Sequence, residues 1–218
     1  MKGIIIKGIA GFYYVKAGEK TFRCKARGIF KKDGIIPYAG DEVVIRKINE
    51  EEALIEEILP RKNSFIRPPI ANVDCFVIVT SVAQPDPNPE IIDRFLVMAE
   101  HNHTDIIICI NKIDLAAAEN RQEIETIYRG IYPIVSVCGK TGEGVDELAA
   151  LMKDRKCALA GPSGAGKSTL INRLQSKYTV ETGGVSDKTK RGKHTTRHAE
   201  LFETDFGALV FDTPGFTS

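Results

Sequence analysis

The sequence lacks any long apolar run, and this absence argues against a membrane-spanning helix. Such a helix needs roughly 18 or more consecutive apolar residues, and no stretch of the 218 residues approaches that length. The apolar start, MKGIIIKGIAGFYYV, is interrupted by Lys7 and has no small-residue cleavage site, so it predicts a strand and not a signal peptide. We therefore expect a cytoplasmic protein without membrane contact.

Cysteine pairs with metal-binding or redox spacing are also missing. The five cysteines are an odd number, none of them forms a CxxC motif, and several lie in apolar, strand-like runs. This pattern argues against a disulfide framework and against a zinc site built from these side chains, and it predicts buried, reduced thiols. The five are Cys24, Cys75, Cys109, Cys138 and Cys157.

The chain as a whole has almost no net charge, but its first 33 residues have an excess of positive charge. The net charge is +1, and 43% apolar with 27% charged residues is typical of a globular protein. Residues 1–33, however, carry nine Lys and Arg against two acidic residues. This basic end indicates a nucleic-acid face. The alternative is that alternating strand residues simply point their charges at water, and composition leaves both interpretations open.

Two domains with different patterns follow from the order of apolar runs. Residues 1–60 hold about five short apolar runs separated by Gly-containing turns, with no convincing helix, which predicts a small antiparallel barrel. The stretch 61–72 has two prolines and predicts an extended connector. We place the domain boundary there, with one domain at 1–66 and the other at 67–218.

Beyond the connector, apolar strands alternate with helical patterns, which predicts a parallel sheet covered by helices. Helices are expected near 89–102, 117–129, 144–153 and 167–175, and the segment 176–197 predicts a long polar loop, a kind of loop that is usually functional. The strand candidates are CFVIVTS, DIIICINK, YPIVSV, KCALAG, RHAELFET and ALVFDTPG.

A phosphate-binding loop is predicted at GPSGAGKST, between a strand and a helix. In such a loop the backbone N–H groups surround the phosphates, Lys167 spans the β- and γ-phosphate oxygens, and the Ser168 hydroxyl binds Mg²⁺. The loop does not identify the base, because ATP-binding proteins share it. Its residues are Gly161, Pro162, Ser163, Gly164, Ala165, Gly166, Lys167, Ser168 and Thr169.

Guanine recognition is predicted at NKID, which follows an apolar strand and so lies where open α/β sheets bind ligands. Asp114 can accept hydrogen bonds from N1–H and the exocyclic amine of guanine, and a carboxylate left unpaired by the wrong base gives discrimination on the order of 10⁴. Asn111 and Lys112 can brace the base and the phosphate loop. Ser136, in IVSVCGKTG, is a weaker candidate to present backbone N–H groups to the guanine O6.

The γ-phosphate sensor is predicted at DTPG, after the apolar strand ALVF. Asp212 would hold Mg²⁺ through water, and the Gly215 N–H would contact the γ-phosphate. Thr195 and Thr196 are candidates for the switch threonine that contacts Mg²⁺ and the γ-phosphate, and the sequence does not choose between them. We take Ser168, Asp212 and, of the two threonines, Thr196 as the predicted Mg²⁺ ligands.

The order of these motifs differs from the usual order in GTPases with a phosphate loop, in which that loop comes first. Here NKID precedes the loop, and DTPG comes last, so we predict a circularly permuted GTPase domain in which every strand is retained. Phe216 follows Gly215, and an apolar ring cannot orient the attacking water, so the resting rate should be comparable to the roughly 10⁻⁴ s⁻¹ of unassisted small GTPases. His194 is a candidate to orient that water once a partner orders its segment.

Taken together, these motifs resemble one known family. GFYYV, CKARGIF and GDEV in the barrel, the linker RKNSFIRPPIANVD, and then IIDRFL, NKID, GPSGAGKST, GKHTT and DTPGF in that order are similar to the RsgA (YjeQ/YloQ) family of ribosome small subunit-dependent GTPases. The resemblance covers the whole chain, and the order of the motifs is highly specific.

The resemblance implies an OB-fold N-terminal domain that docks on ribosomal RNA and a permuted GTPase domain that uses GTP/GDP and Mg²⁺. It also implies a role in late maturation of the small ribosomal subunit, which stimulates hydrolysis, with the equivalent of His194 as a catalytic residue. We expect a monomer. Family members continue past DTPGF into a zinc-binding domain, whereas this chain stops at Ser218, and we expect that domain to be absent here.

Two other functions are weighed against a GTP hydrolase. An ATP-dependent enzyme could use the same phosphate loop, but NKID and the absence of an LSGGQ-like signature oppose it. A nucleotide-gated RNA chaperone that hardly turns over is compatible with Phe216. Turnover with and without ribosomal subunits separates that binder from the enzyme.

Overall fold

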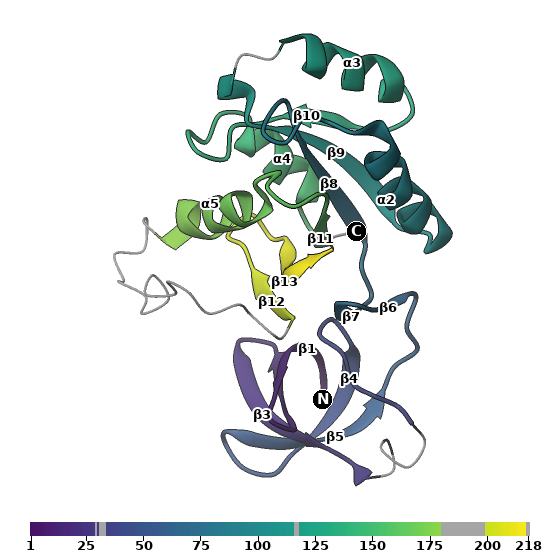
Figure 1. The fold of residues 1–218 in the computed structure, drawn as a ribbon. Helices are drawn as coiled ribbons and strands as arrows, with labels where there is room; N and C mark the ends of the chain where they lie inside the picture. Colours follow the sequence, from purple (N-terminus) through teal and green to yellow (C-terminus); the bar gives the residue numbers. More distant parts are fainter. Residues whose placement is uncertain (29, 31–33, 116–117, 180–198, 217–218) are drawn as a thin grey trace. The chain divides into compact units, whose positions relative to one another are not determined.

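The computed structural model describes residues 1–28, 30, 34–115, 118–179 and 199–216 (Figure 1). Two compact units can be distinguished. One contains Met1–Val73 together with two short segments from near the end of the sequence, and the second begins at Asp74.

The N-terminal unit is a closed barrel of five strands. Antiparallel pairs join β1 to β2, β2 to β3, β4 to β5 and β1 to β4, while β3 and β5 run parallel. The circular order β1-β2-β3-β5-β4 is that of the OB-fold and confirms the predicted barrel. The strands are β1 (Lys2–Ile9), β2 (Phe12–Ala17), β3 (Lys20–Ala26), β4 (Glu42–Lys47) and β5 (Glu52–Ile58).

Alternation along each strand fills the barrel. In β3, Phe22 and Cys24 are buried while Arg23 and Lys25 are exposed, as a strand with one face in a core requires. A similar alternation is seen in β2, β4 and β5, whereas in β1 only Ile5 is buried. The core cluster consists of Ile5, Val15, Ala17, Phe22, Cys24, Phe30, Val43, Ile45, Ala53 and Ile55.

The stretch expected to be an extended connector instead contains a short antiparallel hairpin, β6 (Ser64–Ile66) with β7 (Pro69–Ala71). Asn63 fixes its base, because the Asn63 amide donates to the Val73 carbonyl at 2.9 Å and accepts from the Val73 N–H at 2.8 Å. Proline is rare in the interior of a strand because it has no backbone N–H to donate. Pro69 is the first residue of its strand, where the lack of this N–H does little harm.

The second unit is built on parallel strands in the order β10-β9-β8-β11, and the sheet continues into β13 and β12, whose residues are divided between the two units. Parallel pairs join β8 to β9, β9 to β10 and β8 to β11. Every residue of β8 is buried, as expected for a parallel strand covered on both faces. The strands are β8 (Cys75–Ser81), β9 (Asp105–Asn111), β10 (Ile134–Ser136), β11 (Lys156–Ala160), β12 (Glu200–Glu203) and β13 (Leu209–Phe216).

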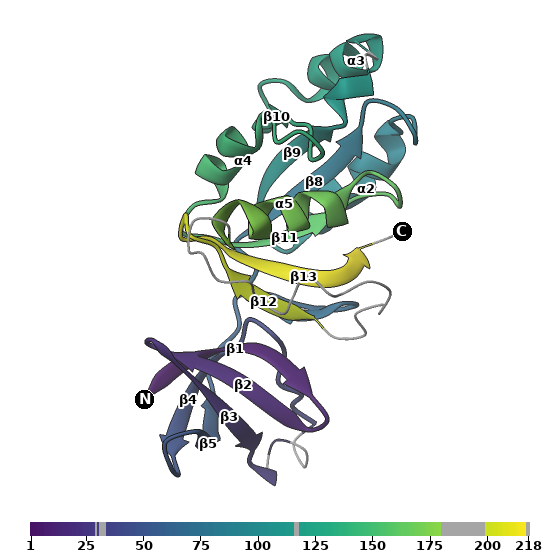
Figure 2. The same cartoon turned by 90° about the vertical axis from the view of Figure 1, so that its left-hand side faces the viewer.

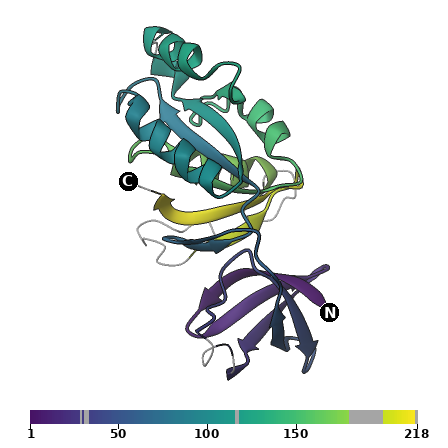
Figure 3. The same ribbon diagram turned by 90° about the vertical axis from the view of Figure 1, so that its right-hand side faces the viewer.

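Helices cover both faces of this sheet. Figures 2 and 3 view the molecule from opposite sides, and they show α4 and α5 in front of the sheet in one view and α2 in front of it in the other. A helix on each face between parallel strands confirms the predicted α/β architecture. The helices are α2 (Pro89–His101), α3 (Ala118–Tyr128), α4 (Val145–Met152) and α5 (Lys167–Thr179), with a 3₁₀ turn, η1 (Ile113–Leu115).

The parallel arrangement determines where a ligand can bind. Because β8, β9, β10 and β11 run in the same direction, the segments that follow them leave the sheet at one edge. NKID begins at the last residue of β9, and the phosphate loop directly follows β11. Among the described residues, no helix is both long and apolar enough to cross a membrane.

Candidate nucleotide-binding site

The loop between β11 and α5 curls around the side chain of its own lysine. Lys167 begins α5, and its Nζ donates hydrogen bonds to the carbonyl oxygens of Gly161 at 2.6 Å and Pro162 at 2.8 Å. Burial lowers the pKa of Lys167 from its ordinary value, because the charged amine is partly removed from water. A half-desolvated cation at a helix N-terminus is a site that attracts phosphate oxygens.

Two glycines of this loop are required by close packing. Gly166 has φ = +94°, and a Cβ there would lie 2.2 Å from the Asn111 amide nitrogen. Gly161 has φ = +141°, and its Cβ would lie 2.1 Å from the Val79 carbonyl oxygen. Any larger residue would be strained by its backbone angle and would clash with β8 or β9.

Asn111 joins the phosphate loop to the turn after β10. This buried side chain donates from Nδ2 to the Ala165 carbonyl at 2.8 Å and accepts at Oδ1 from the Gly139 N–H at 3.0 Å. The two partners lie in segments that follow different strands, so one amide sets the spacing between them. The structure thus brings NKID, the phosphate loop and the 138–142 turn together.

Lys112 and Asp114 lie beside Asn111, which joins the phosphate loop to the 138–142 turn. Lys112 donates to the carbonyl of Gln84, which belongs to the segment after β8. Asp114 is on η1 and exposed, and its Oδ1 accepts a hydrogen bond from the Cys138 thiol at 3.3 Å. An exposed carboxylate at the edge of the sheet is available to a ligand that presents two N–H donors.

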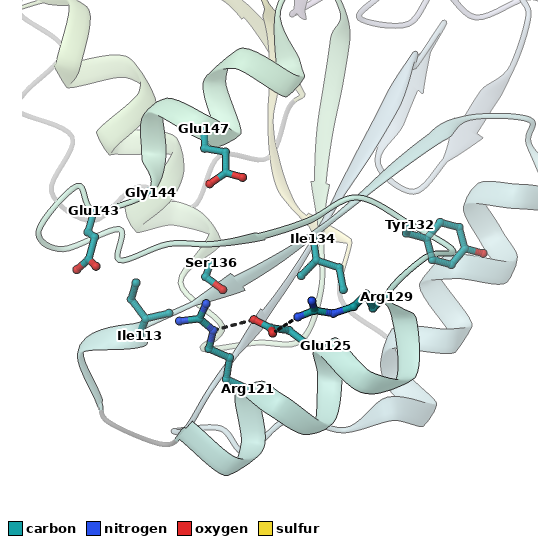
Figure 4. A pocket seen from close by; sticks show the side chains of 10 residues that line it. All are labelled: Ile113, Arg121, Glu125, Arg129, Tyr132, Ile134, Ser136, Glu143, Gly144 and Glu147. Atoms are coloured by element: carbon teal, nitrogen blue, oxygen red, sulfur yellow. Dashed lines mark hydrogen bonds and ion pairs between the residues drawn. The ribbon is translucent and has the colours of Figure 1, made fainter.

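Ser136 lies apart from this contact. It is the last residue of β10 and lines an open hollow of about 530 Å³, shown in Figure 4, together with Ile113 and Arg121. Glu125 in the same hollow pairs with Arg121 at 2.8 Å and with Arg129 at 2.6 Å. No phosphate-loop residue lines this hollow, so we do not assign it to the nucleotide.

Cys138, two residues further on, is the residue that touches Asp114, and sequence reasoning did not single it out. The strand register contains the signal that was missed. Ser136 pairs with Ile110 across β10 and β9, so the residues that follow Ile110 must face the residues that follow Ser136. Asp114 is therefore expected to meet the turn after Val137 and not Ser136 itself.

The first turn of α5 presents the remaining predicted residues of the loop. Ser168 and Thr169 are exposed there, as are Ser163 and Gly164 in the loop, whereas Ala165 is buried. The Ser168 hydroxyl is thus accessible from the side on which phosphates would bind. A single hydroxyl at this position fits Mg²⁺, which usually takes one or two protein oxygens and completes its shell with water and phosphate.

DTPG lies at the end of the last strand, as the strand candidate ALVFDTPG predicted. β13 continues to Phe216, one residue beyond that candidate, so Asp212 and Gly215 both lie within it. His194, Thr195 and Thr196 lie outside the residues that the structure describes.

All five cysteines are buried free thiols, as predicted. Within the described part of the chain, no three His, Cys, Asp or Glu residues cluster as a metal site.

Protein-family models also match the chain as two parts, and they divide it before the hairpin of β6 and β7, whereas the compact units divide at Val73 and Asp74. Residues 58–218 match the model described as RsgA GTPase, and residues 2–55 match the RsgA N-terminal domain.

Curated relatives match along the entire chain. A protein of Caldanaerobacter subterraneus subsp. tengcongensis named "Small ribosomal subunit biogenesis GTPase RsgA" is 47% identical over 219 residues, covering 100% of this chain and 74% of the relative. A protein of Carboxydothermus hydrogenoformans with the same name is 48% identical over 220 residues, covering 100% and 76%.

Solved structures share the fold. The crystal structure of YjeQ from Thermotoga maritima has a TM-score of 0.84 at 36% identity, covering 99% of this chain and 75% of that one. That of YloQ, described as a circularly permuted GTPase, has a TM-score of 0.79 at 36% identity, covering 100% and 72%. The expected order of motifs and the two-domain fold are thereby confirmed, and the chain belongs to the RsgA family of circularly permuted GTPases.

Proposed function

We propose that this GTPase acts in biogenesis of the small ribosomal subunit, that it hydrolyses GTP slowly alone and faster on the subunit, and that its barrel docks on ribosomal RNA. The carrying observation is Asn111, whose two hydrogen bonds join the phosphate loop to the turn beside Asp114. One amide thus holds the phosphate loop against the turn whose Cys138 contacts the carboxylate that would read the base, and this arrangement suits a guanine nucleotide. The names of its relatives provide the subunit as partner.

Each predicted site residue except Ser136 has a role in this proposal. The loop from Gly161 to Thr169 binds the phosphates through its backbone N–H groups, and Lys167 exchanges its loop carbonyls for the β- and γ-phosphate oxygens. Asp114 accepts from the guanine N1–H and exocyclic amine, while Asn111 and Lys112 brace its surroundings. We place the guanine O6 beside the turn after Val137, because Cys138 of that turn contacts Asp114.

Mg²⁺ would be held by the Ser168 hydroxyl, by Asp212 through water and by Thr196 of the switch segment. When bound, it neutralises charge on the β- and γ-phosphate oxygens. Among the three, Ser168 is exposed beside the loop, and Asp212 lies on β13.

Slow resting turnover follows from Phe216, since its ring cannot orient water for in-line attack. His194 would take this part when the chain is bound to the subunit. In related phosphoryl-transfer enzymes, a partner that completes the catalytic site raises turnover by several orders of magnitude.

The outer face of β2 and β3 supports RNA docking through the barrel. Arg23 lies 4.9 Å and Lys25 lies 5.4 Å from the centre of the Phe12 ring, and Lys7 lies 5.3 Å from that of Tyr14. Aromatic rings flanked by cations suit nucleic acid, because bases stack on the rings and phosphates pair with the cations.

The test is GTP hydrolysis by the purified chain alone, with small ribosomal subunits and with large subunits, in parallel with ATP. We expect slow turnover alone and stimulation that requires both GTP and the small subunit. The matched control is Lys167→Ala, which should abolish the stimulated rate and thereby measures any contaminating phosphatase.

Other outcomes would contradict parts of the proposal. Equal turnover of ATP would overturn guanine recognition. GTP turnover that small subunits leave unchanged, with binding to the subunits intact, would mean that the chain is a nucleotide-gated RNA binder.

A further inference from the structure

Arg173 connects the helix of the phosphate loop to the turn beside Asp114. It lies on α5, six residues after Lys167, and is half-buried. Its Nε donates to the Gly139 carbonyl at 3.2 Å, and its Nη2 donates to the Lys140 carbonyl. Two adjacent carbonyls of one turn are thus held by a single guanidinium.

The 138–142 turn also packs tightly on the same helix. A Cβ built on Gly139 would lie 3.2 Å from Leu170 Cδ2, and one built on Gly142 would lie 3.7 Å from the Arg173 guanidinium carbon. Inside the turn, the Gly142 N–H donates to the Cys138 carbonyl at 2.7 Å. The position of Cys138 therefore depends on the contacts that α5 makes with the rest of the turn.

We propose that Arg173 is a positioning residue for guanine recognition, acting through the turn on the contact between Cys138 and Asp114. The inference rests on the proposed role of Asp114. Arg173 grips the turn immediately after Cys138, and the Cys138 thiol donates to Asp114 Oδ1 at 3.3 Å. Arg173 thereby sets the direction in which the Asp114 carboxylate faces the base.

The arrangement has two anchors on the phosphate-loop side. Asn111 ties the Gly139 N–H to Ala165 of the loop, and Arg173 ties the Gly139 carbonyl to α5. Both sides of one peptide segment are fixed to the element that binds the phosphates. Guanidinium is suited to this task because its planar fork donates in two fixed directions, which an ammonium group does not do.

The experiment compares Arg173→Met with Arg173→Lys, and uses Asn172→Ala as the matched control, since Asn172 is exposed on the same helix. Affinity for GDP is measured with a fluorescent GDP probe, and unlabelled GDP and inosine diphosphate (IDP) are compared as competitors. IDP lacks the exocyclic amine that Asp114 would bind, so the GDP-to-IDP affinity ratio reports on Asp114 itself. Melting temperatures are measured alongside.

We expect Arg173→Met to weaken GDP binding by roughly tenfold or more, since it removes hydrogen bonds from a charged donor. The GDP-to-IDP ratio should fall toward one, Arg173→Lys should restore part of it, and Asn172→Ala should match the wild type. A folded Arg173→Met protein with an unchanged ratio would overturn the inference. So would equal weakening of both nucleotides with a lower melting temperature, which would assign Arg173 to fold stability.

The wild-type ratio separates this inference from the proposed function. If the wild-type chain binds GDP and IDP equally well, guanine recognition by Asp114 is wrong, and the inference is overturned along with it. If the wild-type chain prefers GDP and the Arg173→Met variant keeps that preference, only the inference is overturned.

Discussion

At the scale of the residue, the buried thiol of Cys24 gives a pH-dependent prediction. Burial raises its pKa from 9.0 to about 11, because the core of the barrel disfavours the thiolate. A group whose folded pKa is raised contributes stability that is complete below its unfolded pKa and is lost as the pH rises through its folded pKa. The contribution of Cys24 is therefore complete below pH 9.0 and lost toward about 11.

We expect the urea midpoint of the wild type, followed by far-UV circular dichroism, to fall more steeply between pH 9 and 11 than that of Cys24→Ala. The variant starts from a lower midpoint because it leaves a small cavity, so the slopes are compared and not the absolute values. Parallel slopes would show that Cys24 does not ionise on unfolding in this range. Cys109 is present in both proteins and, with its pKa raised to about 12, contributes equally to both slopes.

Residue chemistry also shows what sequence patterns can find at this scale. NKID after an apolar strand, and GKS after a glycine loop, indicated the positions of Asn111, Asp114 and Lys167. The role of Cys138 was not found, because its contact with Asp114 depends on the register of β9 and β10. The role of Arg173 was not found, because it binds carbonyl groups 33 or more residues away along the sequence. Neither a contact made by a thiol nor an arginine that binds backbone carbonyls produces a recognisable motif in the sequence.

At the scale of the element, the phosphate loop offers a comparison of two glycines. Gly166 and Gly164 both have positive φ, at +94° and +79°. An added Cβ would lie 2.2 Å from the Asn111 amide at Gly166, but 3.4 Å from Pro85 Cδ at Gly164. The amide of Asn111 cannot move freely, because Ala165 and Gly139 both bind it.

Gly166→Ala should therefore weaken GDP binding by at least about tenfold more than Gly164→Ala does. Both variants share a backbone strain of roughly 1–2 kcal/mol, and only Gly166→Ala also displaces Asn111. Isothermal calorimetry with GDP measures the difference. Equal losses in the two variants would mean that backbone strain alone, and not the Asn111 junction, governs the loop.

Elements were predicted well where apolar periods were long. The helices and the buried strands of the second unit lie within a few residues of expectation, since β8 and β9 are uninterrupted apolar runs. The hairpin of β6 and β7 was missed because prolines in 61–72 mask a strand, and its formation depends on Asn63 binding Val73. β13, in contrast, runs through DTPG as the strand candidate ALVFDTPG predicted, although Asp, Pro and Gly by themselves favour turns.

At the scale of the whole molecule, permutation leaves the site unchanged because sheet order, and not chain order, places the motifs. NKID follows β9, the Cys138 turn follows β10 and the phosphate loop follows β11, all on parallel strands. Ends of parallel strands meet at one edge of the sheet whichever strand comes first in the chain. Asn111 closes the site across 54 residues of sequence.

The N-terminal barrel gives the last prediction, which concerns how the whole chain binds RNA. If phosphate pairing with basic side chains drives docking, affinity for small-subunit RNA should fall steeply with salt through counterion release. Lys25→Gln, which removes an exposed cation beside Phe12, should reduce the slope of log affinity against log salt by about one.

Phe12→Leu should act differently. It removes a stacking platform worth roughly 1–3 kcal/mol while leaving the charges in place, so affinity should fall and the salt slope should stay the same. Lys153→Gln, an exposed cation of the other unit, is the matched control and should change neither quantity. Filter binding at several salt concentrations measures all four proteins. A flat salt dependence in the wild type would mean that the charges on β2 and β3 only solvate the barrel, because a docking surface that neutralises phosphates must release counterions.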